Sequence, residues 1–183
     1  MRVSQRLAPL VLLVSLMLPH LAWSASKLEI DARVRATIDK LYAEEPVARD
    51  LGAKASGMLV FPRVIKVGIG IGGEHGEGSL LVKGAPVQYY RATAASIGFQ
   101  LGGQAKSEVV MFMSSQALDK FRASDGWEAG VDGSVAIVKF GVGKEIDTNN
   151  VRDPIIGFVF GNQGLMYDLS LEGSKFWKTN KNK

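Results

Sequence analysis

The 183-residue chain contains no cysteine. A fold without cysteine cannot be stapled by disulfides, so its stability has to come from an apolar core. The chain is long enough to bury such a core as one domain. The absence also excludes a Cys–His catalytic pair and a lipid-modified cysteine after an N-terminal leader.

A long hydrophobic run is also missing. The apolar stretch 7–18 is too short to cross a membrane. Arg2 and Arg6 precede it, and the small residues of 22–24 follow it, which is the pattern of a secretory signal peptide. We therefore expect a leader at 1–24 with cleavage near Ser24. The mature chain, from about Ala25, is expected in the periplasm or outside the cell.

Histidine is scarce, and only His75 would remain after the leader is removed. A Ser-His-Asp site would need it. The segment around Ser96 resembles a nucleophile elbow but lacks the first glycine, and its histidine would come before the serine. The sequence therefore predicts no enzyme and no catalytic residues. A site built on acidic residues such as Asp132 is the remaining enzymatic alternative.

The glycines concentrate in the segment 67–81, VGIGIGGEHGEGSLL. It matches G-x-G-x-x-G, but no helix or P-loop lysine follows, so we do not interpret it as a nucleotide site. Apolar residues alternate with glycine, which predicts a curved strand with a bare face that permits a bend or a close backbone approach. We interpret 74–78 as a solvated turn rather than a metal site, and we expect no metal or cofactor.

The rest of the mature chain, 25–183, reads as helices followed by strands. Ser26 predicts the start of a helical region at 27–54, in which Pro46 opens a second helix. The region 57–173 is rich in short strands, with a short helix after Ser114 or Ser115 and a hairpin predicted at 155–172. The fold class expected is α+β, with N-terminal helices packed on a strongly curved, glycine-rich antiparallel sheet that could close into a barrel.

Net charge gives little information, because +4 for the whole chain does not indicate a nucleic-acid partner. The tail 174–183 is distinctive, with four lysines, no acid, and two aromatics. Aromatic and basic residues together favour a membrane surface, although a frayed terminus is an equal alternative. The lipid-binding candidates are Arg63 and Lys66 beside the glycine strand, and Lys175, Phe176, Trp177, Lys178 and Lys181 in the tail.

Five ordered motifs then carry a family resemblance. They are the ASGMLVFP run at 55–62, the glycine segment 68–78, QLGGQAKSE at 100–108, GVDGS at 130–134 and LSLEG at 169–173. Together they resemble the SYLF domain family in its bacterial secreted form.

The resemblance implies lipid binding. Eukaryotic SYLF proteins bind phosphoinositides, and yeast members also bind actin, which a periplasm does not contain. The expected function is therefore a non-enzymatic periplasmic domain that binds anionic phospholipid headgroups at a membrane surface. The alternative is a protein-interaction module for an envelope or cell-surface partner, because edge strands and bare glycine faces can accept another strand.

Overall fold

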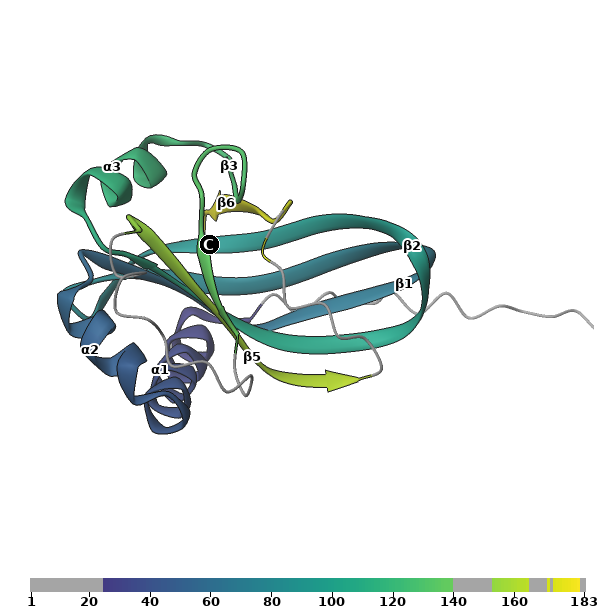
Figure 1. Cartoon of the computed structure of the whole chain (residues 1–183), viewed down its shortest axis with the longest axis horizontal. Helices are drawn as coiled ribbons and strands as arrows, with labels where there is room; N and C mark the ends of the chain where they lie inside the picture. The colour runs from purple at the N-terminus through teal and green to yellow at the C-terminus, as the bar shows by residue number, and fades with distance from the viewer. Residues whose placement is uncertain (1–24, 140–152, 165–170, 172, 182–183) are drawn as a thin grey trace, which may run out of the picture.

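The structure is a computed structural model that describes residues 25–139, 153–164, 171 and 173–181 (Figure 1). The predicted leader lies outside this range. The elements are α1 (Lys27–Glu44), α2 (Pro46–Lys54), β1 (Gly57–Val82), β2 (Ala85–Phe112), α3 (Ser115–Ala123), β3 (Trp127–Glu128), β4 (Ala136–Lys139), β5 (Ile155–Gly164) and β6 (Lys175–Thr179). Helices and a strongly curled sheet confirm the predicted α+β class. None of the described helices is long and apolar enough to cross a bilayer.

The helices begin where the sequence predicts. The Ser26 hydroxyl accepts a hydrogen bond from the Glu29 backbone N–H at 3.3 Å, which caps α1. Pro46 stands in the first turn of α2, where a missing N–H costs nothing. Ser114 caps α3 by accepting from the Ala117 N–H at 3.2 Å. These signals are local, so the sequence alone sets them.

The centre of the fold is one very long hairpin. β1 pairs with β2 in antiparallel fashion from Gly57 opposite Phe112 to Val82 opposite Ala85. Beyond β2 the sheet runs in the order β3-β6-β2-β5-β4, and the pair β4–β5 is parallel while all the others are antiparallel. β6 and β5 bond to different stretches of the same β2 edge, so β2 joins two parts of the sheet.

The hairpin is folded back on itself, as Figure 1 shows at the end away from the helices. Gly78 lies so close to the start of β1 that an added Cβ would stand 2.0 Å from the Val60 carbonyl oxygen. At Gly76 it would stand 3.0 Å from the Arg63 carbonyl oxygen. Each of these two close contacts joins residues that lie about equally far along the chain on either side of 69–71, so β1 bends back on itself there. The register of the hairpin also shifts between residues 69 and 71. The predicted bend and close backbone approach of the glycine strand are confirmed.

The predicted solvated turn at 74–78 is wrong, because β1 continues through it to Val82. The turn is instead at Lys83 and Gly84, which both have positive φ (52° and 76°) as a two-residue hairpin turn requires. The strands predicted separately after it merge into β2. The predicted turn at 161–164 belongs to β5, and most of the predicted return strand lies outside the described residues.

Two apolar cores lie on the two faces of the curled sheet. The inner core, which includes Leu59, Phe61 and Val110, receives Leu118 and Phe121 of α3. The outer core, which includes Val60 and Val109, receives the buried stripes of α1 and α2. Adjacent residues of β1 and β2 therefore point into different cores, as the period of a strand requires. α1 and α2 therefore bury their apolar stripes against the outer face of the sheet.

Candidate functional site

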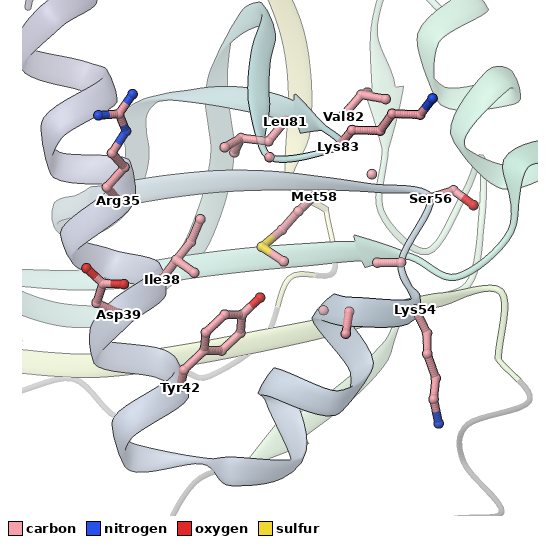
Figure 2. Close-up of a pocket in the computed structure, with 15 residues that line it drawn as sticks. Arg35, Ile38, Asp39, Tyr42, Lys54, Ser56, Met58, Leu81, Val82 and Lys83 are labelled. Carbon is pink, nitrogen blue, oxygen red and sulfur yellow. The ribbon is translucent and has the colours of Figure 1, made fainter.

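A cleft of about 840 Å³ opens between α1, α2 and the tip of the β1–β2 hairpin (Figure 2). Its volume is within the range of small-molecule sites. Its apolar lining is made by Ile38, Tyr42, Met58, Leu81 and Val82. Charged residues that line it are Arg35, Lys54, Lys83 and Asp39.

Three cations surround this cleft from three different elements. Arg35 projects from α1, Lys54 from the end of α2, and Lys83 from the hairpin turn (Figure 2). The positive φ of Lys83 and the adjoining Gly84 places this lysine at the tip of the turn. The charged ends of these residues point outward in different directions, so the cleft combines an apolar lining with a predominantly basic rim (Figure 2).

Tyr42 is fixed at one side of the cleft. Its hydroxyl packs on Gly52, where an added Cβ would come within 2.1 Å of the Tyr42 oxygen. The Arg49 guanidinium lies 5.7 Å from the centre of the Tyr42 ring, a cation–π distance. Burial raises the pKa of Tyr42 above its usual value, and the charge of Arg49 opposes the shift. The ring therefore offers a neutral apolar surface with one hydroxyl.

A second notable group is a cluster of buried charges inside the folded hairpin. Lys66 Nζ lies 3.3 Å from Glu74 Oε1, Lys106 Nζ lies 3.0 Å from Glu74 Oε2, and Lys106 Nζ lies 3.1 Å from Glu108 Oε1. The side chains of both lysines and of Glu108 are 1% exposed, and that of Glu74 is 7% exposed. We call these four residues the inner charge cluster. They lie on the same inward face of the hairpin as the inner core.

Burial and charge pairing act in opposite directions on the pKa values of this cluster. Removal from water raises the pKa of Glu108 to about 7, although the ammonium of Lys106 opposes that shift. The pKa of Lys106 is raised above its usual value, because the carboxylates of Glu108 and Glu74 outweigh its burial. Glu74 lies on β1 after the bend at 69–71. Lys66 lies on β1 before this bend, and Lys106 lies on the part of β2 that pairs with the same stretch. The ion pairs therefore connect the two layers that the folded hairpin forms.

The structure separates the predicted lipid-binding residues. Lys66 is in the inner charge cluster, so the interpretation as a surface contact is not supported in this conformation. Arg63 is exposed, and it lines a hollow of about 190 Å³ together with Arg33 and His75. The binding role predicted for Arg63 remains a prediction.

The tail is not a frayed terminus, because residues 175–179 form β6. Phe176 is 1% exposed and stacks between Phe61 and Trp127, with ring centroids 5.2 and 5.8 Å away. It is therefore part of the core rather than an interfacial anchor. Trp177 is 43% exposed, and its indole N–H donates to the Thr93 hydroxyl at 3.0 Å.

The tail lysines contact acidic side chains. Lys175 Nζ lies 2.9 Å from Glu128 Oε2, Lys178 Nζ lies 3.5 Å from Asp125 Oδ1, and Lys181 Nζ lies 2.6 Å from Glu77 Oε1. The first two pairs are exposed, so water and salt screen them and each contributes little to stability. Charge on the tail is thus partly balanced by the neighbouring elements.

The alternatives considered for acidic residues have structural explanations. The Asp132 carboxylate accepts the Glu128 backbone N–H at 2.7 Å and so stabilises a local turn. Glu74 pairs with the buried lysines, and Glu77 pairs with Lys181. Across the part of the chain that the structure describes, no group of three His, Asp or Glu side chains is placed to hold a metal ion.

The cleft itself was missed by the sequence analysis. Arg35 and Lys54 both lie in the region 27–54 that the sequence predicts as helical, and nothing local marks them as lining a cleft. Lys83-Gly84 is a recognisable turn pair, and it was the only local indication of where the hairpin tip would be. The cleft depends on three elements meeting, which no periodicity in a single element reveals.

The fold is a curled sheet with α1 and α2 on its outer face and a cleft with an apolar lining near the hairpin tip. Residues 93–183 match the Ysc84 family model, described as "Las17-binding protein actin regulator". These residues cover most of β2 and everything after it. The match confirms the resemblance to the SYLF family that the sequence motifs predicted.

A curated relative gives a second, weaker likeness. The chain is 26% identical over 153 residues to "Beta cell expansion factor A" of Aeromonas veronii. The matched part is 83% of this chain but 57% of that protein. The chain thus spans little more than half of the relative, whose activity as a whole protein does not transfer to it.

Proposed function

We propose that this protein is a non-enzymatic lipid-binding domain that docks on anionic phospholipids in the periplasm or outside the cell. The observation that carries the proposal is the cleft, where an apolar lining lies beside Arg35, Lys54 and Lys83. The family suggests lipid or protein interaction, and the cleft favours a lipid because it pairs apolar surface with positive charge. The location rests on the predicted leader.

The expected mechanism has two steps. The basic residues attract the anionic surface, each contributing about 1 kcal/mol near such a membrane. An acyl segment or the glycerol region then covers the apolar lining formed by residues such as Ile38 and Met58. Exposed residues outside the cleft, including Arg63 and Trp177, extend the contact in this proposal.

A vesicle flotation assay tests the proposal. The wild-type protein is mixed at low salt with vesicles of phosphatidylglycerol and cardiolipin, and with phosphatidylcholine vesicles as a comparison. The variant Arg35→Gln/Lys54→Gln/Lys83→Gln should bind anionic vesicles about 100-fold more weakly, because three basic contacts are lost. Circular dichroism spectra should confirm that the variant is folded.

The matched control is Lys40→Gln/Lys120→Gln/Arg122→Gln, which removes the same charge from exposed residues outside the cleft. It should retain most of the binding. Equal loss in both variants would indicate a diffuse electrostatic attraction without a role for the cleft. Absence of wild-type binding to anionic vesicles would refute the lipid proposal itself.

A protein partner is the second candidate function, and one observation favours it. Among the described residues, β1 pairs only with β2, so the opposite edge of a 26-residue strand has no strand partner. Such an edge can accept a strand from another protein. A purified partner that binds in a 1:1 ratio without lipid, and competes with vesicles, would support this function over lipid binding.

A further inference from the structure

The first described residue and the C-terminal segment meet at a single carboxylate. The Ala25 backbone nitrogen donates to Glu77 Oε2 at 3.1 Å. Lys181 Nζ lies 2.6 Å from Glu77 Oε1 and donates to the Ala25 carbonyl oxygen at 3.3 Å. The side chains of Glu77 and Lys181 are only 18% and 10% exposed. Three segments far apart in sequence are thus joined at one partly buried point.

This point coincides with the boundary of the predicted leader. The small residues of 22–24 predict cleavage before Ala25. Hydrolysis of the peptide bond between Ser24 and Ala25 adds water across it, leaving a carboxylate on Ser24 and a free amino group on Ala25. The atom that becomes the new amino terminus is the nitrogen already bonded to Glu77.

We propose that cleavage after Ser24 creates an ammonium group on Ala25 that forms a salt bridge with Glu77 and anchors the mature N-terminus to β1. In the precursor the same nitrogen is an amide with a single proton and no net charge. After cleavage it is a cation, so a Coulombic attraction to the Glu77 carboxylate is added to the hydrogen bond that the amide already makes. The proposal rests on the predicted leader and does not depend on lipid binding.

The surroundings set the strength of this anchor. Lys181 contacts Oε1 of Glu77, whereas the Ala25 nitrogen contacts Oε2. After cleavage the Glu77 carboxylate would therefore lie between two cations, the Lys181 ammonium and the Ala25 ammonium. Arg33, Arg63 and His75 line the adjoining hollow together with Ala25 and Glu77, and Arg33 is itself paired with Glu29. The guanidinium groups of Arg33 and Arg63 repel an ammonium on Ala25 at longer range, where water screens the repulsion more effectively.

The pH dependence follows from the sign of the interaction. An ordinary α-amino group has a pKa of about 7.7–8.0, and a carboxylate partner raises that pKa in the folded protein. The stabilisation is therefore fully present below about pH 7.7 and is lost as the pH rises through the raised pKa of the folded state. A chain whose nitrogen at Ala25 remains an amide lacks this dependence.

The first experiment determines the mature N-terminus. The full chain, including its own leader, is expressed in a Gram-negative host, and the intact mass of the processed protein is measured. The expected mass is that of a chain beginning at Ala25. A mature chain beginning at any other residue would overturn the proposal, because no ammonium would then stand at Glu77.

The second experiment measures the anchor. A protein released from a cleavable fusion with Ala25 as its first residue is compared with one carrying Gly-Ser before Ala25. At pH 7 the extension should lower the melting temperature by about 2–4 °C, the shift expected for a single interaction in a domain of this size. At pH 10 the difference should be much smaller.

The variant Glu77→Gln, made in both proteins, serves as the control. The effect of the extension should disappear there, because no carboxylate remains to pair with the ammonium. Equal melting temperatures of the two wild-type proteins at pH 7 would overturn the proposal, and this comparison needs no mutation. Vesicle binding is measured separately, so failure of the anchor and failure of the lipid proposal are distinguishable.

Discussion

Two lysines of this protein are almost completely removed from water. Lys66 and Lys106 would be surface residues in most folds, since an ammonium is very rarely buried without a partner. Here each has a carboxylate within hydrogen-bonding distance, and Glu74 serves both. A buried ion pair offsets its desolvation only in part, so the presence of the inner charge cluster is weak evidence that these ion pairs add stability.

At the residue scale, Glu108 should make the stability of the fold depend on pH. Its pKa is raised from an ordinary value of 4.5 to about 7, so the folded state holds a proton that the unfolded state loses. The stabilisation is therefore complete below about pH 4.5 and is lost as the pH rises to 7. Glu108→Gln should flatten this part of the profile and raise the melting temperature at pH 8 relative to wild type.

Melting temperatures measured at pH 5, 6, 7 and 8 for both proteins test this prediction. Glu44→Gln is the control, because Glu44 forms an exposed ion pair with Lys40 and should leave the profile unchanged. An identical decline from pH 5 to pH 8 in wild type and Glu108→Gln would show that other groups cause the dependence.

At the scale of elements, the main feature is the doubled hairpin, which is the β1–β2 hairpin folded back on itself into two layers. Its two layers touch through backbone at Gly78 and Gly76, because neither residue has a Cβ to hold the layers apart. Glycine therefore acts here through the space it leaves. The positive φ values that also favour glycine occur elsewhere, at positions such as Gly84 and Gly130.

Alanine substitutions in this strand should have very different costs. In Gly78→Ala the new methyl group would collide with the Val60 carbonyl, and the layers would have to separate, at a cost of about 2–3 kcal/mol or more. In Gly73→Ala the nearest atom is the Ala94 carbonyl oxygen at 3.9 Å, so the change should be within about 0.5 kcal/mol. Urea denaturation of both variants measures the difference, and equal losses would contradict the close approach.

The same elements show why sequence predicted some parts of this fold and missed others. Caps such as Ser26 and Ser114 act within one turn, so their helices were predicted correctly. Residues 74–78 were predicted as a turn, yet the long pairing with β2 carries β1 through them to Val82. A register shift between Phe61 and Val64 then changes which face the following residues occupy. Lys66 enters the interior for that reason, and no local pattern indicates it.

At the scale of the whole molecule, the C-terminal strand closes the sheet. β6 bonds to β2 on one side and to β3 on the other, and its Phe176 ring lies between Phe61 and Trp127. The sequence predicted either a membrane-binding tail or a frayed terminus here, because the segment holds four lysines and two aromatic residues and no acid. The pairing with β2 joins segments more than 80 residues apart, and only the assembled sheet reveals it.

Truncation after Gly173 should therefore destabilise the whole domain. It removes β6 and leaves a void beside Phe61, and losing a buried phenylalanine alone typically costs 3–5 kcal/mol. Thermal unfolding followed by circular dichroism should show a much lower or non-cooperative transition. Trp177→Ala, at a half-exposed position, is the control and should retain a cooperative transition. A truncated protein with wild-type stability would contradict this role of β6.

The doubled hairpin also constrains how the chain can change during evolution. The bend of β1 lies between residues 69 and 71. Because the strands are paired from the turn at Lys83-Gly84 onward, the number of residues between this turn and the bend sets where β2 has to bend as well. An insertion between bend and turn in one strand has to be absorbed by a β-bulge, like the register shift between Leu80 and Leu81, or by an equal insertion in the other strand. Homologous sequences that change length here should therefore either change both arms of the hairpin together or place the extra residue at such a register shift.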